Sequence, residues 1–370
     1  MGLLRLLLAL SVVAVHCGSI LHMKFVGGQI AVQSFYIISG FYMSLILNEK
    51  YVGGGVKSYR LFITNRLLRL YPIYWLILIA TVVYCLVTGY NNNWQVIPKF
   101  EFYASVKFNL KTLTFLIFAN LFIIGQALVM FLGISPETGG LYFTTNFMNS
   151  NPQLYNFLFI GQAWTLELEI LFYLIAPFIV RRKLKTIIAL ILLSIICRFV
   201  IYDYIGLKND PWTYRFFPTE IAFFLTGCLS YQIYTRIKTI AIKRTISLSI
   251  FAFVIGLTLV YPFLPGIKVG FMPFSLKELF YFFVVMCTIP FLFTYFKNSK
   301  LDTRLGELSY PVYISHLFVM LVIERTYGSI TNAGWLIAVL TISLSYILNV
   351  IVSNPIERYR QKRVAKFSMI

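Results

Sequence analysis

Long apolar stretches of about twenty residues recur along the chain, and short polar segments separate them. A helix that crosses a membrane needs about twenty predominantly apolar residues, so this pattern predicts an all-α, polytopic bundle of ten to eleven transmembrane segments. Because no polar segment is long enough to fold alone, we expect residues 1–370 to form one membrane domain with no appended soluble domain. The apolar stretches lie at roughly 3–22, 30–48, 70–89, 112–133, 164–180, 186–206, 216–235, 246–265, 277–296, 309–328 and 334–353.

The distribution of basic residues predicts an orientation. Cytoplasmic loops of membrane proteins are enriched in Lys and Arg, whereas the segment 134–163 contains neither and is therefore expected outside. Three apolar stretches lie between the first two basic clusters. If both clusters are cytoplasmic, the chain between them must cross the membrane an even number of times. We therefore expect 112–133 to be re-entrant or to lie partly in the interface, with both termini in the cytoplasm. The basic clusters fall within 49–69, 181–185, 236–244, 297–304 and 358–366.

Composition adds the nature of the surroundings. The chain is 59% hydrophobic and only 12% charged, whereas soluble domains are about 25% charged. The net charge of +19 comes from the basic clusters, so it indicates contact with anionic lipid and not with nucleic acid. The five cysteines lie in apolar segments without the spacing of a disulfide framework or a zinc site, and we expect no metal.

Two polar residues in the first apolar stretch, Arg5 and His16, are the strongest functional signal. We interpret this stretch as a retained helix and not a cleaved signal peptide, because His16 interrupts its apolar run. An ionisable side chain inside a membrane segment is costly and faces protein or a water-filled cavity. On a helix the two residues lie roughly 16 Å apart, so Arg5 is expected near the cytoplasm and His16 in the outer half.

Glu169 is expected at the depth of His16 on another helix. A carboxylate that holds one imidazole nitrogen leaves the other free as a general base. The structural alternative is a histidine that is merely hydrogen-bonded between helices. Glu167 faces a different side of its helix and is expected to snorkel to water at the outer end.

Arg66 and Arg69 supply a second signal at the expected cytoplasmic mouth of the third apolar stretch. Their i, i+3 spacing places both on one helix face, and paired guanidinium groups are suited to phosphate oxygens. Together with Arg5 they predict an anion-binding mouth. An anchor against anionic lipid explains Lys57 and Arg60 better than it explains this pair.

Other polar positions carry weaker signals. The small residues Ser39 and Gly40 predict close packing between helices. His316 is expected about seven residues in from the cytoplasmic side, where it either hydrogen-bonds across the bundle or contacts the middle of a ligand. Several charged residues toward the outer half predict ion pairs and a wet cavity suited to a polyhydroxy acceptor such as a sugar. These residues are Arg198, Asp203, Arg215, Glu220 and Glu278.

Five segments in this order resemble the acyltransferase-3 family of integral membrane acyltransferases, over essentially the whole chain. They are Arg5-x10-His16, FYIISGF (35–41), RLLRLYP (66–72), WTLELEILFYL (164–174) and ELSYPVYISH (307–316). The resemblance implies that Arg5 and His16 form the essential pair, that Arg66 and Arg69 are the family's RxxR motif, and that Glu169 is its glutamate. The implied catalytic residues are His16, Glu169 and Arg5. The implied donor contacts are Arg5, Ser39, Arg66, Arg69 and His316.

The resemblance also implies a reaction. An enzyme of the bacterial cytoplasmic membrane would take an acyl group, usually acetyl, from cytoplasmic acyl-coenzyme A. It would deliver that group to a carbohydrate hydroxyl outside, for example in O-antigen or exopolysaccharide. A transporter or flippase of an anionic glycan or metabolite also explains charges inside the bundle, but not an arginine pair joined to a deep histidine. A sensor or structural membrane protein predicts no cavity through the bundle.

Overall fold

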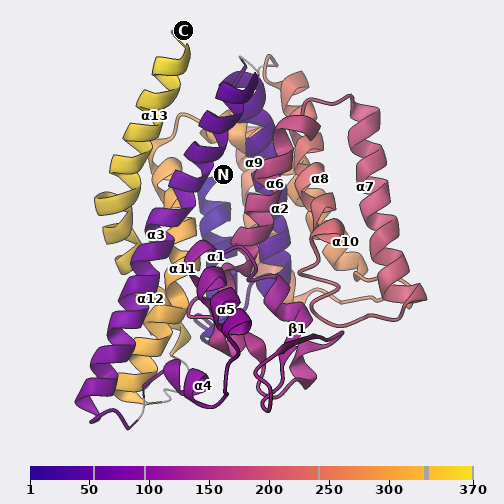
Figure 1. Ribbon diagram of the computed structural model, residues 1–370. Coiled ribbons are helices and arrows are strands. Elements are labelled where there is room, and N and C mark those ends of the chain that lie inside the picture. The colour runs from indigo at the N-terminus through magenta and orange to yellow at the C-terminus, as the bar shows by residue number, and fades with distance from the viewer. Residues whose placement is uncertain (53–54, 96, 241, 329–332, 369–370) are drawn as a thin grey trace.

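The apolar stretches fold into helices that run side by side, and a small β-hairpin lies at one end of the bundle (Figure 1). The computed structural model describes residues 1–52, 55–95, 97–240, 242–328 and 333–368. The predicted helical class is confirmed. The two strands of the hairpin, β1 (Leu132–Ile134) and β2 (Leu141–Phe143), are antiparallel, with Gly133 opposite Tyr142.

The α-helices are α1 (Gly2–His16), α2 (Gly28–Glu49), α3 (Gly55–Asn91), α4 (Phe100–Ala104), α5 (Leu110–Phe122), α6 (Trp164–Ile179), α7 (Leu184–Phe199), α8 (Phe217–Ile237), α9 (Arg244–Val260), α10 (Leu276–Phe296), α11 (Lys300–Tyr327), α12 (Gly334–Leu348) and α13 (Asn354–Ser368). Short 3₁₀ turns are η1 (Leu128–Phe131), η2 (Phe147–Asn149), η3 (Leu154–Phe157), η4 (Gly161–Ala163) and η6 (Tyr261–Phe263). Two π-helical turns, η5 (Val200–Tyr204) and η7 (Asn349–Ser353), extend α7 and α12.

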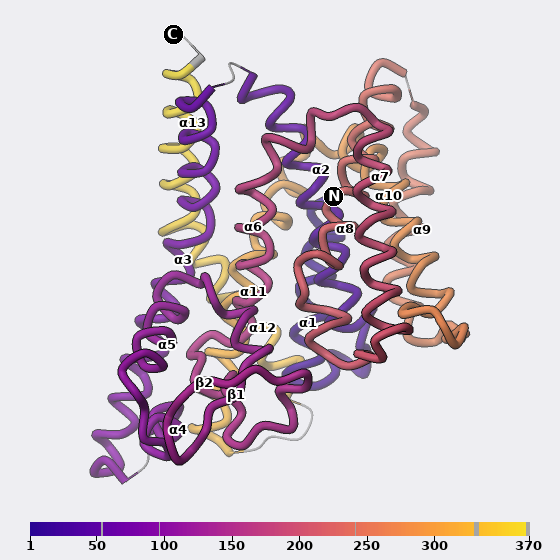
Figure 2. The backbone as a smooth tube through the Cα atoms, turned by 45° about the vertical axis from the view of Figure 1, so that its right-hand side comes forward, coloured from indigo at the N-terminus to yellow at the C-terminus, as the bar shows by residue number. Residues whose placement is uncertain are grey.

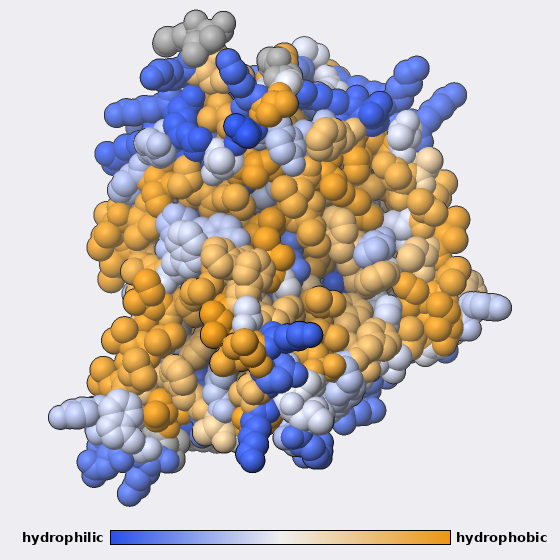
Figure 3. Space-filling model, viewed as in Figure 1, coloured by the Kyte–Doolittle hydropathy of each residue, from blue (hydrophilic) through white to orange (hydrophobic). Residues whose placement is uncertain are grey.

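Eight helices in the described part of the chain are long and apolar enough to cross a membrane. A membrane-spanning bundle is therefore supported, while the predicted count of ten to eleven segments stays a prediction. Two other helices of the bundle are not among these eight. Helix α1 has only 15 residues, and α8, with 21 residues, carries the buried Glu220. On the face shown in Figure 3, an apolar band surrounds the middle of the molecule and hydrophilic residues lie at both ends.

The end of the bundle where α2 and α6 finish and α3 begins is called the basic end here. It carries Lys50, Lys57, Arg60, Arg181 and Arg182. Helix α13 lies along the first part of α3 at this end (Figure 2). The sequence placed α13 only in a basic tail, because its residues show no apolar stretch.

Helix α3 begins earlier than the apolar pattern predicted. It starts at Gly55 and not near residue 70, because helical backbone continues through the charged segment that precedes the apolar stretch. Arg66 and Arg69 therefore lie about three turns inside a 37-residue helix and not at its mouth.

Helix α5 ends before it can cross a membrane. Its 13 residues rise about 20 Å, whereas the hydrocarbon core is about 30 Å thick. Glu167 of α6 is buried behind the turn that follows α5 and accepts hydrogen bonds from the backbone amides of Gly125, at 2.8 Å, and Ala127. The prediction that Glu167 snorkels to water is wrong, because this turn leaves buried amides that need an acceptor.

Helices α1 and α11 run parallel and in register. Asp302, in the first turn of α11, accepts hydrogen bonds from the backbone amides of Gly2 (2.7 Å) and Leu3 (3.3 Å), and so caps the N-terminus of α1. From Gly2 to His16 and from Asp302 to His316 the two helices advance by the same number of residues. The shared starting level therefore brings both histidines to the same depth.

Helices α2 and α8 approach each other through glycines. A Cβ atom at Gly40 would lie 1.8 Å from the carbonyl oxygen of Phe224, and one at Gly227 would lie 2.0 Å from the carbonyl oxygen of Ile37. Only glycine fits such contacts between two backbones. The predicted packing role of Gly40 agrees with this arrangement.

Replacing Gly40 by alanine is expected to separate α2 from α8 and to destabilise the protein by about 1–3 kcal/mol or more. The measurement is the thermal unfolding temperature of the purified protein in detergent. The matched control is Gly256→Ala in α9, where an added Cβ meets nothing within 4 Å and the higher helix propensity of alanine should leave stability unchanged or raised. Equal unfolding temperatures for Gly40→Ala and the unaltered protein would contradict the close approach.

Candidate active site

A cavity lies between α1, α2, α3, α6 and α11, and the space within it amounts to about 750 Å³ when the adjoining open solvent is included. Four of the predicted site residues line it: Arg5, Ser39, Arg69 and Glu169. Arg66 lies one turn closer to the basic end than Arg69 and is only 6% exposed. His16 and His316 are not among the described residues that line the cavity, and they lie beyond its other end.

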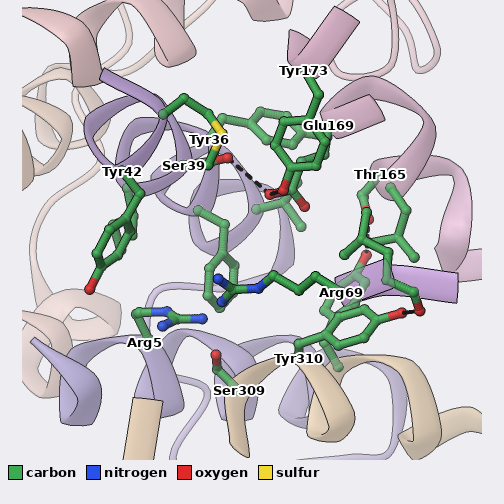
Figure 4. A pocket seen from close by; sticks show the side chains of 17 residues that line it. Arg5, Tyr36, Ser39, Tyr42, Arg69, Thr165, Glu169, Tyr173, Ser309 and Tyr310 are labelled. Carbon is green, nitrogen blue, oxygen red and sulfur yellow. Dashed lines mark hydrogen bonds between the residues drawn. The ribbon is translucent and has the colours of Figure 1, made fainter. Parts of the chain in front are cut away.

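Two guanidinium groups enter this cavity without acceptors. Arg5 extends from α1 and Arg69 from α3, and their charged groups lie close enough to interact (Figure 4). Neither makes a hydrogen bond to a described residue, although Arg5 also lies 5.9 Å from the ring centroid of Tyr42. Arg66 adds a buried Nε atom that has no hydrogen-bond partner in the described part of the chain. Because buried charged donors are costly when unpaired, this region can hold an anion such as a phosphate.

Glu169 lies across the cavity from these arginines (Figure 4). One of its carboxylate oxygens accepts hydrogen bonds from the hydroxyl groups of Ser39, at 2.9 Å, and Tyr173. The prediction that Glu169 holds the imidazole of His16 is wrong, because Nδ1 of His16 is bonded to His316 and Glu169 lies in the cavity, which His16 does not line. Glu169 interacts electrostatically with Arg5 and Arg69 instead.

His16 is held by a second histidine. Its Nδ1 atom lies 2.8 Å from Nε2 of His316, and the two ring planes are 8° apart. His316 was expected about seven residues in from the cytoplasmic side, whereas in the structure it lies at the level of His16, which was expected in the outer half. Helix α11 begins at Lys300, well before the apolar stretch that marked it, and this longer helix carries His316 to the level of His16.

The hydrogen bonds of this pair assign the protons of both rings. His316 Nδ1 lies 2.7 Å from the carbonyl oxygen of Tyr313. A carbonyl only accepts, so His316 Nδ1 carries the hydrogen and, in the neutral ring, Nε2 is an acceptor. His16 Nδ1 must then donate, which leaves a lone pair on His16 Nε2. His16 is exposed while His316 is buried, so the pair can be approached from outside the bundle on the His16 side.

Tyr313 connects the cavity to the histidine pair. Its hydroxyl accepts a hydrogen bond from Thr165 Oγ1 at 2.9 Å and donates one to the carbonyl oxygen of Gln162 at 3.0 Å. Its backbone carbonyl accepts the hydrogen bond of His316 Nδ1, so this residue contacts both the cavity and the histidine pair. The hydroxyl of Tyr36 also lines the cavity, is buried, and has no partner among the described residues.

Most of the charged residues of the outer half have protein partners in the structure, while the wet cavity suited to a sugar stays a prediction. Arg198 and Glu220 form an ion pair of 2.6 Å inside the bundle, where they are 4% and 0% exposed. Arg215 donates to Asp210 at 2.8 Å. Glu278 caps the N-terminus of α10. The ion pairs agree with the sequence, which predicted such pairs for some of these residues.

The cavity contains several residues that the sequence did not single out. They are Tyr36, Tyr42, Thr165, Tyr173, Ser309, Tyr310 and Tyr313. Most of them belong to the segments that carry the family resemblance, and their helical spacing could have identified them. Thr165, Glu169 and Tyr173 follow one another at i, i+4 and i+8, which places them on one face of α6.

Comparison with known families gives one result. A family model described as an acyltransferase domain matches residues 1–354. No curated protein and no solved structure matches the chain. The matched range contains all five segments of the resemblance, every residue that lines the cavity, and both histidines. The chain therefore belongs to the acyltransferase-3 family, and with its membrane-spanning helices it is a membrane acyltransferase.

Proposed function

We propose that this protein is an O-acyltransferase of the bacterial inner membrane. It moves an acetyl or other short acyl group from cytoplasmic acyl-coenzyme A to a hydroxyl of a glycan on the other side. The observation that carries the proposal is one cavity with unpaired guanidinium groups at one end and, at the other, a tyrosine whose carbonyl holds the histidine pair. Such a cavity suits a donor with phosphates at one end and a thioester at the other.

The donor enters from the basic end, which faces the cytoplasm by the distribution of Lys and Arg. Its phosphates meet Arg66 and Arg69, and Arg5 adds a third positive charge. Arg5 lies roughly 16 Å from His16 along α1, so its role is to bind the donor and not to touch the reacting atoms. The extended pantetheine arm spans that distance, and the hydroxyls of Ser39 and Tyr36 lie along its path.

His16 supplies the base. Its Nε2 lone pair takes the proton from the acceptor hydroxyl as the hydroxyl oxygen attacks the thioester carbonyl carbon. The new C–O bond forms, the C–S bond breaks, and the proton passes from His16 to the leaving sulfur. His316 keeps Nδ1 of His16 in its donating role throughout. An alternative use of the same nitrogen is direct attack on the thioester, which gives an acyl-histidine that the acceptor then resolves.

Tyr313 controls access to this base. Its hydroxyl, bonded to Thr165 and Gln162, stands between the cavity and the histidine pair. The thioester reaches His16 when the Tyr313 ring turns aside. The exposed face of His16 receives the acceptor from outside.

The test is to incubate the purified protein in nanodiscs with acetyl-coenzyme A and to follow thiol release, with and without candidate surface glycans. We expect release to depend on a glycan, with the acetyl group recovered on that glycan by mass spectrometry. A burst of thiol without acceptor, equal to the amount of protein, selects the acyl-histidine route. Absence of thiol release with every glycan, together with passage of a labelled anionic glycan into proteoliposomes, would instead establish the transporter.

A further inference from the structure

Helix α13 brings a further arginine to the basic end of the cavity. The helix is fixed on α3 by Arg363, whose guanidinium group donates to Asn65 Oδ1 at 2.7 Å. Arg360 lies one turn earlier on the same face of α13 and is only 6% exposed. Its charge interacts with those of Arg66 and Arg69. These three residues, Arg66, Arg69 and Arg360, are called the arginine cluster below.

The protein supplies too few acceptors for this cluster. Arg360 Nη1 donates to the carboxylate of Glu357, and the charges of Arg66 and Arg69 interact with the same carboxylate. The Nε atoms of Arg66 and Arg360 are both buried and have no hydrogen-bond partner among the described residues. Buried polar groups are nearly always hydrogen-bonded. Two unpaired donors from different helices therefore point to an acceptor that comes from outside the chain.

We propose that the arginine cluster binds the nucleotide phosphates of the acyl donor, and that Arg360 supplies its outermost guanidinium group. This inference rests on the proposed function, because that function requires a phosphate-bearing donor. The role of Arg360 does not follow from membership of the family. The family match ends at residue 354, the first residue of α13, so the rest of this helix, with Arg360, lies outside it. A phosphate is the fitting ligand because its oxygens accept several charge-assisted hydrogen bonds at once.

Anionic lipid headgroups share this phosphate chemistry. The position of the cluster favours the nucleotide. Arg66 and Arg360 are each 6% exposed, and Arg69 lines the cavity that leads toward His16. A headgroup at the bilayer surface would meet exposed residues such as Arg60 first.

The experiment measures the binding of adenosine 3′,5′-bisphosphate to the full-length protein by calorimetry, in nanodiscs of phosphatidylcholine. We expect Arg360→Gln to weaken the affinity at least about tenfold, because one charge-assisted contact is lost. The matched control is Arg358→Gln, which removes the same charge from an exposed position on the same helix. Its affinity should change less than about twofold, because solvent and salt screen an exposed charge.

A second variant separates ligand binding from a merely structural ion pair. Glu357→Gln removes the charge from the acceptor of Arg360 and so weakens the same contact, but it takes a negative charge away from the anion site. We expect its affinity for the bisphosphate to equal or exceed that of the unaltered protein. If Arg360 serves only to hold α13 through Glu357, both variants should weaken binding alike, and the proposal is then overturned.

The remaining outcomes are also decisive. If the unaltered protein binds the bisphosphate and Arg360→Gln binds it equally well, the inference on Arg360 fails while the proposed function stands. If the unaltered protein binds neither the bisphosphate nor acetyl-coenzyme A, both fail. If Arg360→Gln binds the bisphosphate normally but retains less phosphatidylglycerol in mixed nanodiscs, the ligand is a lipid headgroup and the nucleotide assignment is overturned.

Discussion

His16→Ala is expected to abolish acyl transfer while the protein remains folded and membrane-inserted. The lone pair on His16 Nε2, assigned through the hydrogen bonds to His316 and Tyr313, has no substitute in the alanine variant. Loss of a general base costs about 10²–10⁴-fold in rate, and loss of an attacking nucleophile costs more. Either route of transfer therefore predicts thiol release at the background level of acetyl-coenzyme A hydrolysis.

The matched control is His22→Ala. His22 lies in the turn after α1 and is exposed, so its removal should leave the rate of thiol release within about twofold of the unaltered protein. Size-exclusion chromatography and thermal unfolding of both variants establish that they are folded. Full transfer by a folded His16→Ala protein would end the assignment of this residue as base or nucleophile.

Much of the architecture follows from local sequence signals. About twenty apolar residues in a row predict a membrane helix, and each predicted stretch contains a helix in the structure. Burial of charge was equally informative. Arg5 and Arg69 lie in different helices, yet both line the cavity, because an ionisable group in lipid surroundings has few places other than an interior cavity.

The partners of the buried polar groups were harder to predict. His16 and His316 are 300 residues apart, and their pairing depends on where α11 begins. The apolar pattern placed that start near residue 309, whereas the helix begins at Lys300 because charged residues continue its first turns. Glu169 and Glu167 were likewise placed in the right helix with the wrong partners. Glu169 accepts hydrogen bonds from a serine of α2 and from a tyrosine one turn further along α6. Glu167 accepts from backbone amides of a turn, and no periodic pattern in the sequence predicts that turn.

Helix α13 shows a further limit of hydrophobic patterning. Its surface is largely polar and basic, so composition alone suggests a tail that contacts anionic lipid. Its docking depends instead on Arg363 bonding to Asn65 and Thr64 of α3. Those bonds form between side chains that are distant in sequence, and neither residue type nor spacing predicts them.

Arg69→Glu is expected to raise the KM for acetyl-coenzyme A at least about 100-fold, which corresponds to about 2.7 kcal/mol of lost binding free energy. The substitution removes a guanidinium group that has no hydrogen-bond partner among the described residues and places a negative charge at the proposed site of the donor phosphates. The kcat at saturating donor should change much less, because the reacting atoms lie at His16, beyond the opposite end of the cavity. Steady-state thiol release over a range of donor concentrations separates the two parameters.

Two further variants make this result specific. Arg69→Gln should raise the KM less than Arg69→Glu does, since it removes the positive charge without adding a negative one. Arg60→Glu reverses a charge at an exposed position on the same helix, and we expect its KM to stay within about threefold of the unaltered value because solvent screens it. A KM that rises equally in the Arg60 and Arg69 variants would indicate only general attraction of the anionic donor to the basic end. An unchanged KM in a folded Arg69→Glu protein would place the donor phosphates elsewhere.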